Sequence, residues 1–405
     1  MGLFRRFWSG EEGRKGNTAI VFALSLIPII GATGAALDYS MANSSRTSMQ
    51  KALDATALAL AKLMPLSQAS LGNVKVGVSQ SDLQITPPAI GRLVLNVSGQ
   101  YQPVVAGVIG INNFPVGAQA EVTWGIKKLE IALALDNTGS MLSNNKMTEL
   151  KTASHNLLNT LQQAARNPDD VKVAIVPFHV QVKVGTANVN ATWIKWTDWD
   201  AENQTCTGSS WNRVCTPKNH NQWTGCIEDR DQSHDTLDTA PTNNTTRFPA
   251  IQCGWQLAEI MPLTNNWTNL HNRIDAMVPD GNTNVTIGLA WAWHLLTPTE
   301  PYTEALPNNT PDLSRFIILL TDGDNTQNRW STSQNSIDNR TALACANVKA
   351  AGIKIYAIRV INGNATLLRN CASDPSMYFD VQSASDLNAV FNAIGGQLAS
   401  LHLSQ

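Results

Sequence analysis

Three oxygen-bearing side chains follow one apolar run at every second position. In "IALALDNTGSM" the run 131–135 is followed by Asp136, Thr138 and Ser140. A second carboxylate, Asp322, ends the run "FIILLTD", and a further hydroxyl, Thr283, stands in "DGNTNVTIGL". Carboxylates and hydroxyls are hard ligands that suit Mg²⁺, Mn²⁺ or Ca²⁺ better than zinc. The five residues therefore predict a divalent-cation site, with Mg²⁺ preferred, that keeps coordination positions open for an acidic group of a partner.

Each of these residues also has an ordinary interpretation. Asp136 alone is typical of a helix N-cap, and Ser140 or Thr283 alone is typical of a cap or turn. Two acids at strand ends, together with a loop of hydroxyls, favour the metal site over these separate roles. Asp324, in "TDGDN", is close enough to modulate the charge of the site, but we do not expect it to bind the ion directly.

The elements that must position these residues lie in 127–405, where strand-like runs alternate with helical stretches. The expected strands are 129–135, 171–178, 315–321, 353–360 and 377–381, and the expected helices lie near 146–166, 284–297, 337–351, 364–372 and 384–400. Continuous Ile, Leu and Val runs are typical of strands covered on both faces. The pattern predicts an α/β fold with a doubly wound, mostly parallel sheet. Ligands bind beyond the carboxyl ends of such strands, where Asp136 and Asp322 stand.

Residues 127–405 resemble a von Willebrand factor type A domain, a Rossmann-like fold. That family has a metal-ion-dependent adhesion site (MIDAS) with the pattern Asp-x-Ser-x-Ser, a distant Thr and a distant Asp. The resemblance places the pattern on Asp136, Thr138, Ser140, Thr283 and Asp322. Thr138 departs from the usual Ser, because it keeps the hydroxyl and adds a methyl group. The resemblance implies metal-dependent adhesion.

The N-terminus predicts a membrane anchor. The 22 residues between Lys15 and Asp38 carry no charge, and as a helix they span about 33 Å, close to the ~30 Å of a hydrocarbon core. The alternative is a cleaved signal peptide, whose apolar region is shorter, about 7–15 residues. Four basic residues precede the run, so we expect residues 1–16 to be cytoplasmic, residues 17–37 to span the membrane, and the remainder to face outward.

The same segment resembles Flp/Tad pilus-assembly proteins of the TadE/TadG type over roughly residues 14–61. The resemblance implies a bacterial inner-membrane protein with one span, whose outer domains are periplasmic or surface-exposed. It implies protein partners among other Tad, pilus or envelope components. True pilins of this system have Glu at the fifth position after the cleavage site, where this chain has Val21 after Gly16. This difference favours a retained anchor.

Two regions connect the anchor to the α/β domain. Residues 38–64 have apolar residues at helical spacing and predict a stalk that ends at Pro65. The stalk's apolar stripe packs either on its own domain or on other subunits. Residues 65–126 alternate apolar with polar or small residues, which predicts a small β-rich domain with turns at Pro87, Pro88 and 112–113.

An insertion at about 185–267 interrupts the α/β domain. It holds seven tryptophans, Trp193, Trp196, Trp199, Trp211, Trp223, Trp255 and Trp267, and four cysteines, Cys206, Cys215, Cys226 and Cys253. The indoles form either the core of a disulfide-linked subdomain or an aromatic surface for sugar or protein. Zinc bound by Cys206, Cys215, His220 and Cys226 is a third interpretation. An oxidising compartment favours disulfides, with three possible pairings in the insertion. Of the remaining cysteines, Cys345 lies in the helix before the strand 353–360 and Cys371 ends the helix after it. Both helices flank this one strand, so we expect the two cysteines to pair.

Composition limits the function further. The net charge of −2, with no basic cluster outside the N-terminus, argues against nucleic acid. Nucleophile-elbow, His-Glu-x-x-His and P-loop patterns do not occur, and His155 and His294 are expected on helix faces, so we do not expect an enzyme. The sequence thus predicts a pilus-assembly or adhesion component. The alternatives are an adhesin or scaffold not tied to pili, or a subunit that serves a cytoplasmic AAA+ ATPase.

Overall fold

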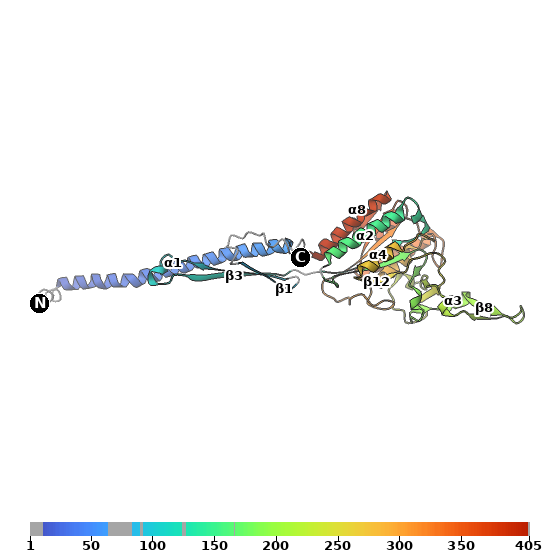
Figure 1. Ribbon diagram of the computed structural model, residues 1–405, viewed down its shortest axis with the longest axis horizontal. Helices are drawn as coiled ribbons and strands as arrows, with labels where there is room; N and C mark the ends of the chain where they lie inside the picture. Colours follow the sequence, from blue (N-terminus) through green and yellow to red (C-terminus); the bar gives the residue numbers. More distant parts are fainter. Residues whose placement is uncertain (1–10, 64–82, 90–91, 124–126, 166, 404–405) are drawn as a thin grey trace. The chain divides into compact units, whose positions relative to one another are not determined.

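The computed structural model describes residues 11–63, 83–89, 92–123, 127–165 and 167–403. The chain divides into two compact units, Met1–Gly125 and Ile126–Ser404, here called unit 1 and unit 2 (Figure 1). We describe each unit by itself.

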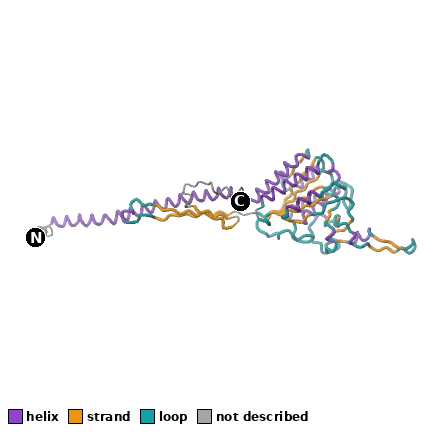
Figure 2. The backbone as a smooth tube through the Cα atoms, in the orientation of Figure 1, coloured by secondary structure: helices purple, strands orange, loops and turns teal. Residues whose placement is uncertain are grey.

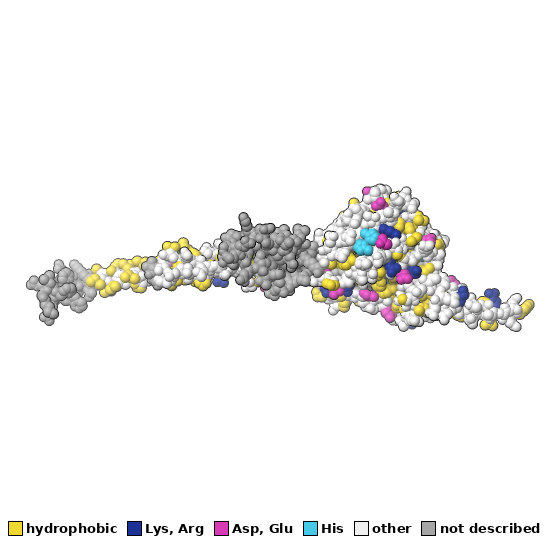
Figure 3. All heavy atoms as spheres, viewed as in Figure 1, with side chains coloured by type: hydrophobic (Ala, Val, Ile, Leu, Met, Phe, Trp, Pro, Cys, Tyr) yellow, Lys and Arg dark blue, Asp and Glu magenta, His cyan; other side chains and the backbone are white. Residues whose placement is uncertain are grey.

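One long helix, α1 (Glu11–Leu63), dominates unit 1. It runs without a break through Pro28, so the expected span and the expected stalk belong to one helix. Apolar side chains of its first half are exposed, including Ile20, Phe22 and Ile27, as the space-filling view shows (Figure 3). By length and composition this is the one helix of the described residues that can cross a membrane.

A three-stranded antiparallel sheet completes unit 1, with strands in the order β1 (Leu83–Ala89), β2 (Arg92–Tyr101) and β3 (Phe114–Thr123). The prediction of turns at Pro87 and Pro88 was wrong, because both prolines lie in β1. The β1–β2 register shifts between Thr86 and Ala89, where the unpaired prolines need no ladder hydrogen bond. The first part of the predicted β-rich domain, residues 65–82, lies outside the described residues.

The second half of α1 packs on this sheet. Leu53 and Ala57 are 1% exposed, and the side-chain amide of Gln50 donates to the carbonyl of Gln119 on β3 at 2.8 Å. Asp38 is buried and accepts backbone N–H bonds from Val104 and Val105 at 3.0 and 2.7 Å. The apolar stripe of the stalk therefore covers its own domain, which is the first of the two alternatives.

Unit 2 is built on a six-stranded sheet in the order β12–β5–β4–β13–β14–β15. Figure 2 shows the strands of this unit in orange among purple helices. Five strands are parallel: β4 (Lys128–Asp136), β5 (Val171–Phe178), β13 (Leu313–Thr321), β14 (Lys354–Val360) and β15 (Tyr378–Val381). Strand β12 (Met261–Thr264) joins the edge antiparallel to β5. The predicted α/β class with a mostly parallel sheet is confirmed.

Helices cover both faces of this sheet. One apolar cluster joins the sheet to α2 (Lys146–Ala164), α4 (Trp267–Asp275) and α8 (Leu387–Leu403). The other joins it to α5 (Val285–Leu295), α6 (Gln334–Ala350) and α7 (Ala365–Cys371). Strands with both faces covered need the continuous apolar runs found in the sequence.

The insertion packs against the rest of unit 2 and shares its core. It contains a four-stranded sheet in the order β6 (Val182–Lys183), β10 (Cys226–Ile227), β11 (Phe248–Ile251) and β7 (Ile194–Lys195). It also contains the helix α3 (Thr197–Glu202) and a hairpin of β8 (Gln204–Thr207) and β9 (Val214–Pro217). Trp193, Trp199 and Trp223 are at most 4% exposed, whereas Trp211 is 94% exposed. Trp193 meets Trp291 of α5 with ring centroids 6.3 Å apart. Most of these indoles therefore extend the domain core rather than form a separate one.

Two elements inside or beside the assigned insertion, β12 and α4, were not expected from the sequence. Strand β12 has four residues and contains Pro262, so it gives no strand signal, and its edge position is where proline is tolerated.

Three disulfides join all six cysteines: Cys206–Cys215, Cys226–Cys253 and Cys345–Cys371. The first closes the β8–β9 hairpin, and the third links α6 to α7 as expected from the sequence. These bonds contradict the zinc alternative, and His220 contacts Asp200 through Nε2 at 2.7 Å.

Candidate metal centre

Strand β4 places Asp136 at its carboxyl end. The carboxylate is fully buried, and it accepts the backbone N–H of Thr138 at 2.8 Å and the hydroxyl of Thr321 at 2.6 Å. The first bond curls the turn after β4, and the second ties this turn to β13. Asp136 stands at the carboxyl end of its strand, as the sequence predicts, and it is completely buried there.

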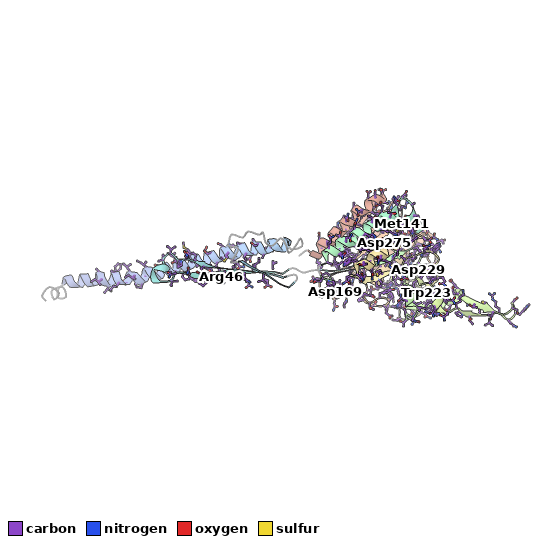
Figure 4. All side chains as sticks on the ribbon, viewed as in Figure 1. Arg46, Met141, Asp169, Trp223, Asp229 and Asp275 are labelled. Atoms are coloured by element: carbon purple, nitrogen blue, oxygen red, sulfur yellow. A yellow bond between two sulfur atoms is a disulfide. The ribbon has the colours of Figure 1, made fainter. Side chains whose placement is uncertain are left out.

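The turn after Asp136 leads the two hydroxyls toward the second carboxylate. The Thr138 and Ser140 side-chain oxygens are 2.9 Å apart, and the Ser140 hydroxyl donates to Asp322 Oδ1 at 2.6 Å. Thr138 and Asp322 are each 1% exposed, whereas Ser140 is exposed. Met141 is fully buried and anchors the turn in the core (Figure 4). The site therefore opens toward solvent at Ser140.

The loop before α5 brings Thr283 to the same place. The N–H of Gly139 donates to the carbonyl of Gly281 at 3.0 Å, and the N–H of Asp280 donates to the carbonyl of Asn137 at 2.8 Å. A Cβ atom on Gly323 would lie 3.6 Å from both the Ser140 and the Thr283 hydroxyl oxygens. Both hydroxyls thus face the glycine next to Asp322, and the structure gathers all five predicted residues, while Asp324 is exposed.

Burial sets the charge properties of the site. Desolvation, and then the negative charge of Asp322, raise the pKa of Asp136 from 3.8 to about 6, against hydrogen bonds from Thr138 and Thr321 that lower it. Two carboxylates held this close together repel each other, so the arrangement favours a bound cation.

Lys146 is the main residue of the site that sequence reasoning missed. Its ammonium lies 2.7 Å from Asp322 Oδ2, and the two side chains are 2% and 0% exposed. Lys146 begins α2, in the buried stripe that continues with Leu150, Ala153 and Leu157. A lysine at an apolar-stripe position was the available signal, since buried lysines are rarely left unpaired.

A residue of the insertion, Asp229, holds the loop that carries Thr283 through hydrogen bonds to the neighbouring Asn284. The side-chain amide of Asn284 donates to both oxygens of Asp229, at 3.0 and 2.8 Å, and Arg329 Nη1 donates to the Asp229 carbonyl at 2.9 Å. Burial raises the pKa of Asp229 to about 6. No sequence motif marks Asp229, which Figure 4 labels, because its role depends on a contact between the insertion and the start of α5.

The residues present fit a hard divalent cation. Two carboxylates and three hydroxyls from three chain segments converge, and all are oxygen donors. The Asp322 carboxylate already forms an ion pair with the ammonium of Lys146. Asp136, Thr138, Ser140, Thr283 and Asp322 would hold the ion, directly or through water.

Two family models match the chain. The model of Flp pilus-assembly TadE/G-like proteins matches residues 16–61, and the von Willebrand factor type A model matches residues 234–393. The second match includes Thr283 and Asp322 and begins after Asp136, Thr138 and Ser140. A comparison with curated proteins gives no match.

Several solved structures are similar to this chain at low identity. The vWF domain of the type V pili tip protein Mfa5 from Porphyromonas gingivalis is 10% identical, with 70% of this chain and 98% of that chain covered and a TM-score of 0.43. The pilus adhesin SpaC from Lactobacillus rhamnosus GG is 15% identical, with 79% and 34% covered and a TM-score of 0.41. A mussel byssus thread matrix protein with a zinc-occupied MIDAS motif is 14% identical, with 68% and 48% covered and a TM-score of 0.36. This chain spans about half or less of the last two proteins. The two family-model matches, and not these structures, show a TadE/G-like segment and a segment that matches the von Willebrand factor type A domain.

Proposed function

We propose that this chain is a membrane-anchored, outward-facing component of Tad/Flp pilus assembly or adhesion. It binds a protein partner through a divalent cation held by Asp136, Thr138, Ser140, Thr283 and Asp322. A bound cation supplies an electrophilic centre that accepts an oxygen atom from an acidic group of the partner. The observation that carries the proposal is the hydrogen-bonded chain from Thr138 through Ser140 to Asp322, which gathers hard donors at the carboxyl ends of β4 and β13.

The state of Ser140 supports binding rather than catalysis. Its hydroxyl donates to Asp322 and contacts Thr138, so its contacts in the structure are those of a ligand set and not of a nucleophile held by an imidazole. We therefore propose that the protein is not an enzyme.

The anchor and the disulfides support an outward-facing unit 2. The apolar first half of α1 follows Arg14 and Lys15, which favours a cytoplasmic N-terminus. Three disulfides are typical of an oxidising compartment such as the periplasm. A cytoplasmic ATPase partner requires the opposite topology. A reporter at the C-terminus distinguishes the two, and a cytoplasmic signal would refute the proposed location.

Metal titration tests the site. The full chain in detergent is titrated with Mg²⁺, Mn²⁺ and Ca²⁺ by calorimetry, beside the Asp136→Asn and Asp324→Asn variants. We expect Asp136→Asn to lose binding, because an amide cannot neutralise the ion, and we expect the exposed Asp324→Asn to change it little. Equal affinity in Asp136→Asn and wild type would refute the site.

Capture from membranes tests the partner. Proteins retained by wild type with Mg²⁺, but lost with chelator and lost with Asp136→Asn, are the expected partners. Retention of the same proteins under all three conditions would mean that binding does not involve the metal centre.

A further inference from the structure

The buried ammonium of Lys146 forms an ion pair with Asp322, a carboxylate of the metal centre. It lies against Asp322 Oδ2, while Ser140 occupies Asp322 Oδ1. A buried charge is tolerated when it is paired, and this pair is almost fully withdrawn from water. Interactions between charges are stronger in such surroundings than at the surface.

The lysine changes the charge count of the centre. Asp136, Asp322 and Lys146 together carry one negative charge when both acids are ionised. A divalent cation converts this to one positive charge. Without the ammonium the same ion would convert two negative charges to none, and an acidic group would then meet a neutral centre.

We propose that Lys146 sets the charge of the centre, so that it weakens binding of the divalent cation and strengthens the later binding of a carboxylate ligand. This inference rests on the proposed function of the same site. Like charges in a buried site disfavour each other, so the ion is bound less tightly beside the ammonium. The net positive charge that results attracts an anion, and the ion-free centre repels it. Lys146 thereby makes the ion-bound centre positive rather than neutral, which favours capture of an acidic partner.

A purely structural role for Lys146 makes a different prediction. If the ammonium only neutralises Asp322 so that the turn can fold, its removal loosens the whole site. The affinities for the ion and for the carboxylate would then fall together. Opposite changes in the two affinities are therefore the signature of the proposal.

The experiment uses the full chain in detergent, with Mn²⁺ as the ion and acetate as the carboxylate. Electron paramagnetic resonance gives the Kd for Mn²⁺, and water-proton relaxation of the Mn²⁺-loaded protein gives the Kd for acetate. The test variant is Lys146→Gln, which removes the charge and keeps a hydrogen-bond donor. Lys146→Arg keeps the charge. Lys151→Met is the matched control on α2, because the Lys151 ammonium donates to a backbone carbonyl, that of Asp275.

We expect Lys146→Gln to bind Mn²⁺ about tenfold or more tightly and acetate several-fold more weakly than wild type. Lys146→Arg and Lys151→Met should resemble wild type in both. A Lys146→Gln protein that folds only with Mn²⁺ present would also support the proposal, because the ion then replaces the ammonium. Unchanged affinities, parallel changes, or misfolding even with Mn²⁺ would overturn it. If neither wild type nor any variant binds Mn²⁺, the proposed function is refuted as well. If all of them bind Mn²⁺ with the same affinity, only the role proposed for Lys146 is refuted.

Discussion

Replacement of Asp136 by Asn should stabilise the metal-free protein at neutral pH. Burial and the charge of Asp322 raise the pKa of Asp136 from 3.8 to about 6. A raised folded-state pKa means that the folded state binds the proton more tightly than the unfolded state. Stability from this group is therefore present below pH 4 and is lost as the pH rises through 6.

The size of the effect follows from the shift. About two pKa units at about 1.4 kcal/mol each give about 3 kcal/mol of stability lost by wild type between pH 4 and pH 7. Asn has nearly the same shape, and its oxygen can still accept the Thr138 N–H, which lies 2.8 Å from Asp136 Oδ1. In wild type the Thr321 hydroxyl donates to Asp136. In the variant the Asn side-chain amide can donate to the Thr321 hydroxyl oxygen instead. The variant therefore avoids the cost of the buried charge and keeps most of the packing.

Urea unfolding of the full chain in detergent, followed by tryptophan fluorescence with EDTA present, measures this difference. At pH 7.5 we expect Asp136→Asn to be more stable than wild type by about 2–3 kcal/mol, and at pH 4.0 we expect the two to be close. Other acids titrate in both proteins, such as the partly buried Glu228 with a pKa of about 7. The difference in the free energy of unfolding between variant and wild type therefore isolates Asp136.

If the variant and wild type differ in free energy of unfolding by the same amount at both pH values, the reasoning is refuted. Ionisation of the buried carboxylate would then not destabilise the folded protein. Saturating Mg²⁺ is the complementary measurement. Mg²⁺ should stabilise wild type and leave the stability of Asp136→Asn unchanged. The difference in the free energy of unfolding between the two proteins should therefore shrink or change sign.

Asp136→Ala should abolish divalent-cation binding in a calorimetric titration, and it should cost more stability than Asp136→Asn, because it leaves the Thr138 N–H without its buried acceptor; retained binding would contradict the site. Thr138→Ser should change the Mg²⁺ Kd only slightly, since the hydroxyl persists; loss of binding would show that the methyl group shapes the centre. Replacing Cys345 and Cys371 by Ala should lower the free energy of unfolding by about 3–4 kcal/mol, measured in urea, because the bond closes a loop with a sequence separation of 26; no change would mean that the unfolded chain gains little freedom. Removal of residues 1–37 should release a soluble chain whose unit 2 melts as in the full protein, and a wholly insoluble product would show that the helix before Asp38 is part of the fold.

The α/β class of unit 2 could be predicted because hydrophobic patterning is a local property. Runs such as 129–135 and 171–178 must be covered on both faces, and the helices between them carry apolar residues at helical spacing. The membrane-length run is equally local, since its length and lack of charge meet the bilayer requirement without reference to other residues. Strand β12 was missed because a four-residue edge strand is defined by its partner β5 and not by its own composition.

The sequence by itself determined which residues carry hard oxygen ligands and that Asp136 and Asp322 stand at strand ends. Only the tertiary structure decided that Asp136 is buried, that Ser140 donates to Asp322, and that an ammonium shares the centre. Lys146 and Asp322 are 176 residues apart in sequence, and Asn284 and Asp229 are 55 apart. Contacts of this kind depend on how β4, β13, α2 and the insertion pack together. The physical reason is that local propensity fixes where an element begins and ends, whereas burial, and with it the pKa and charge of a site, depends on all the elements that surround it.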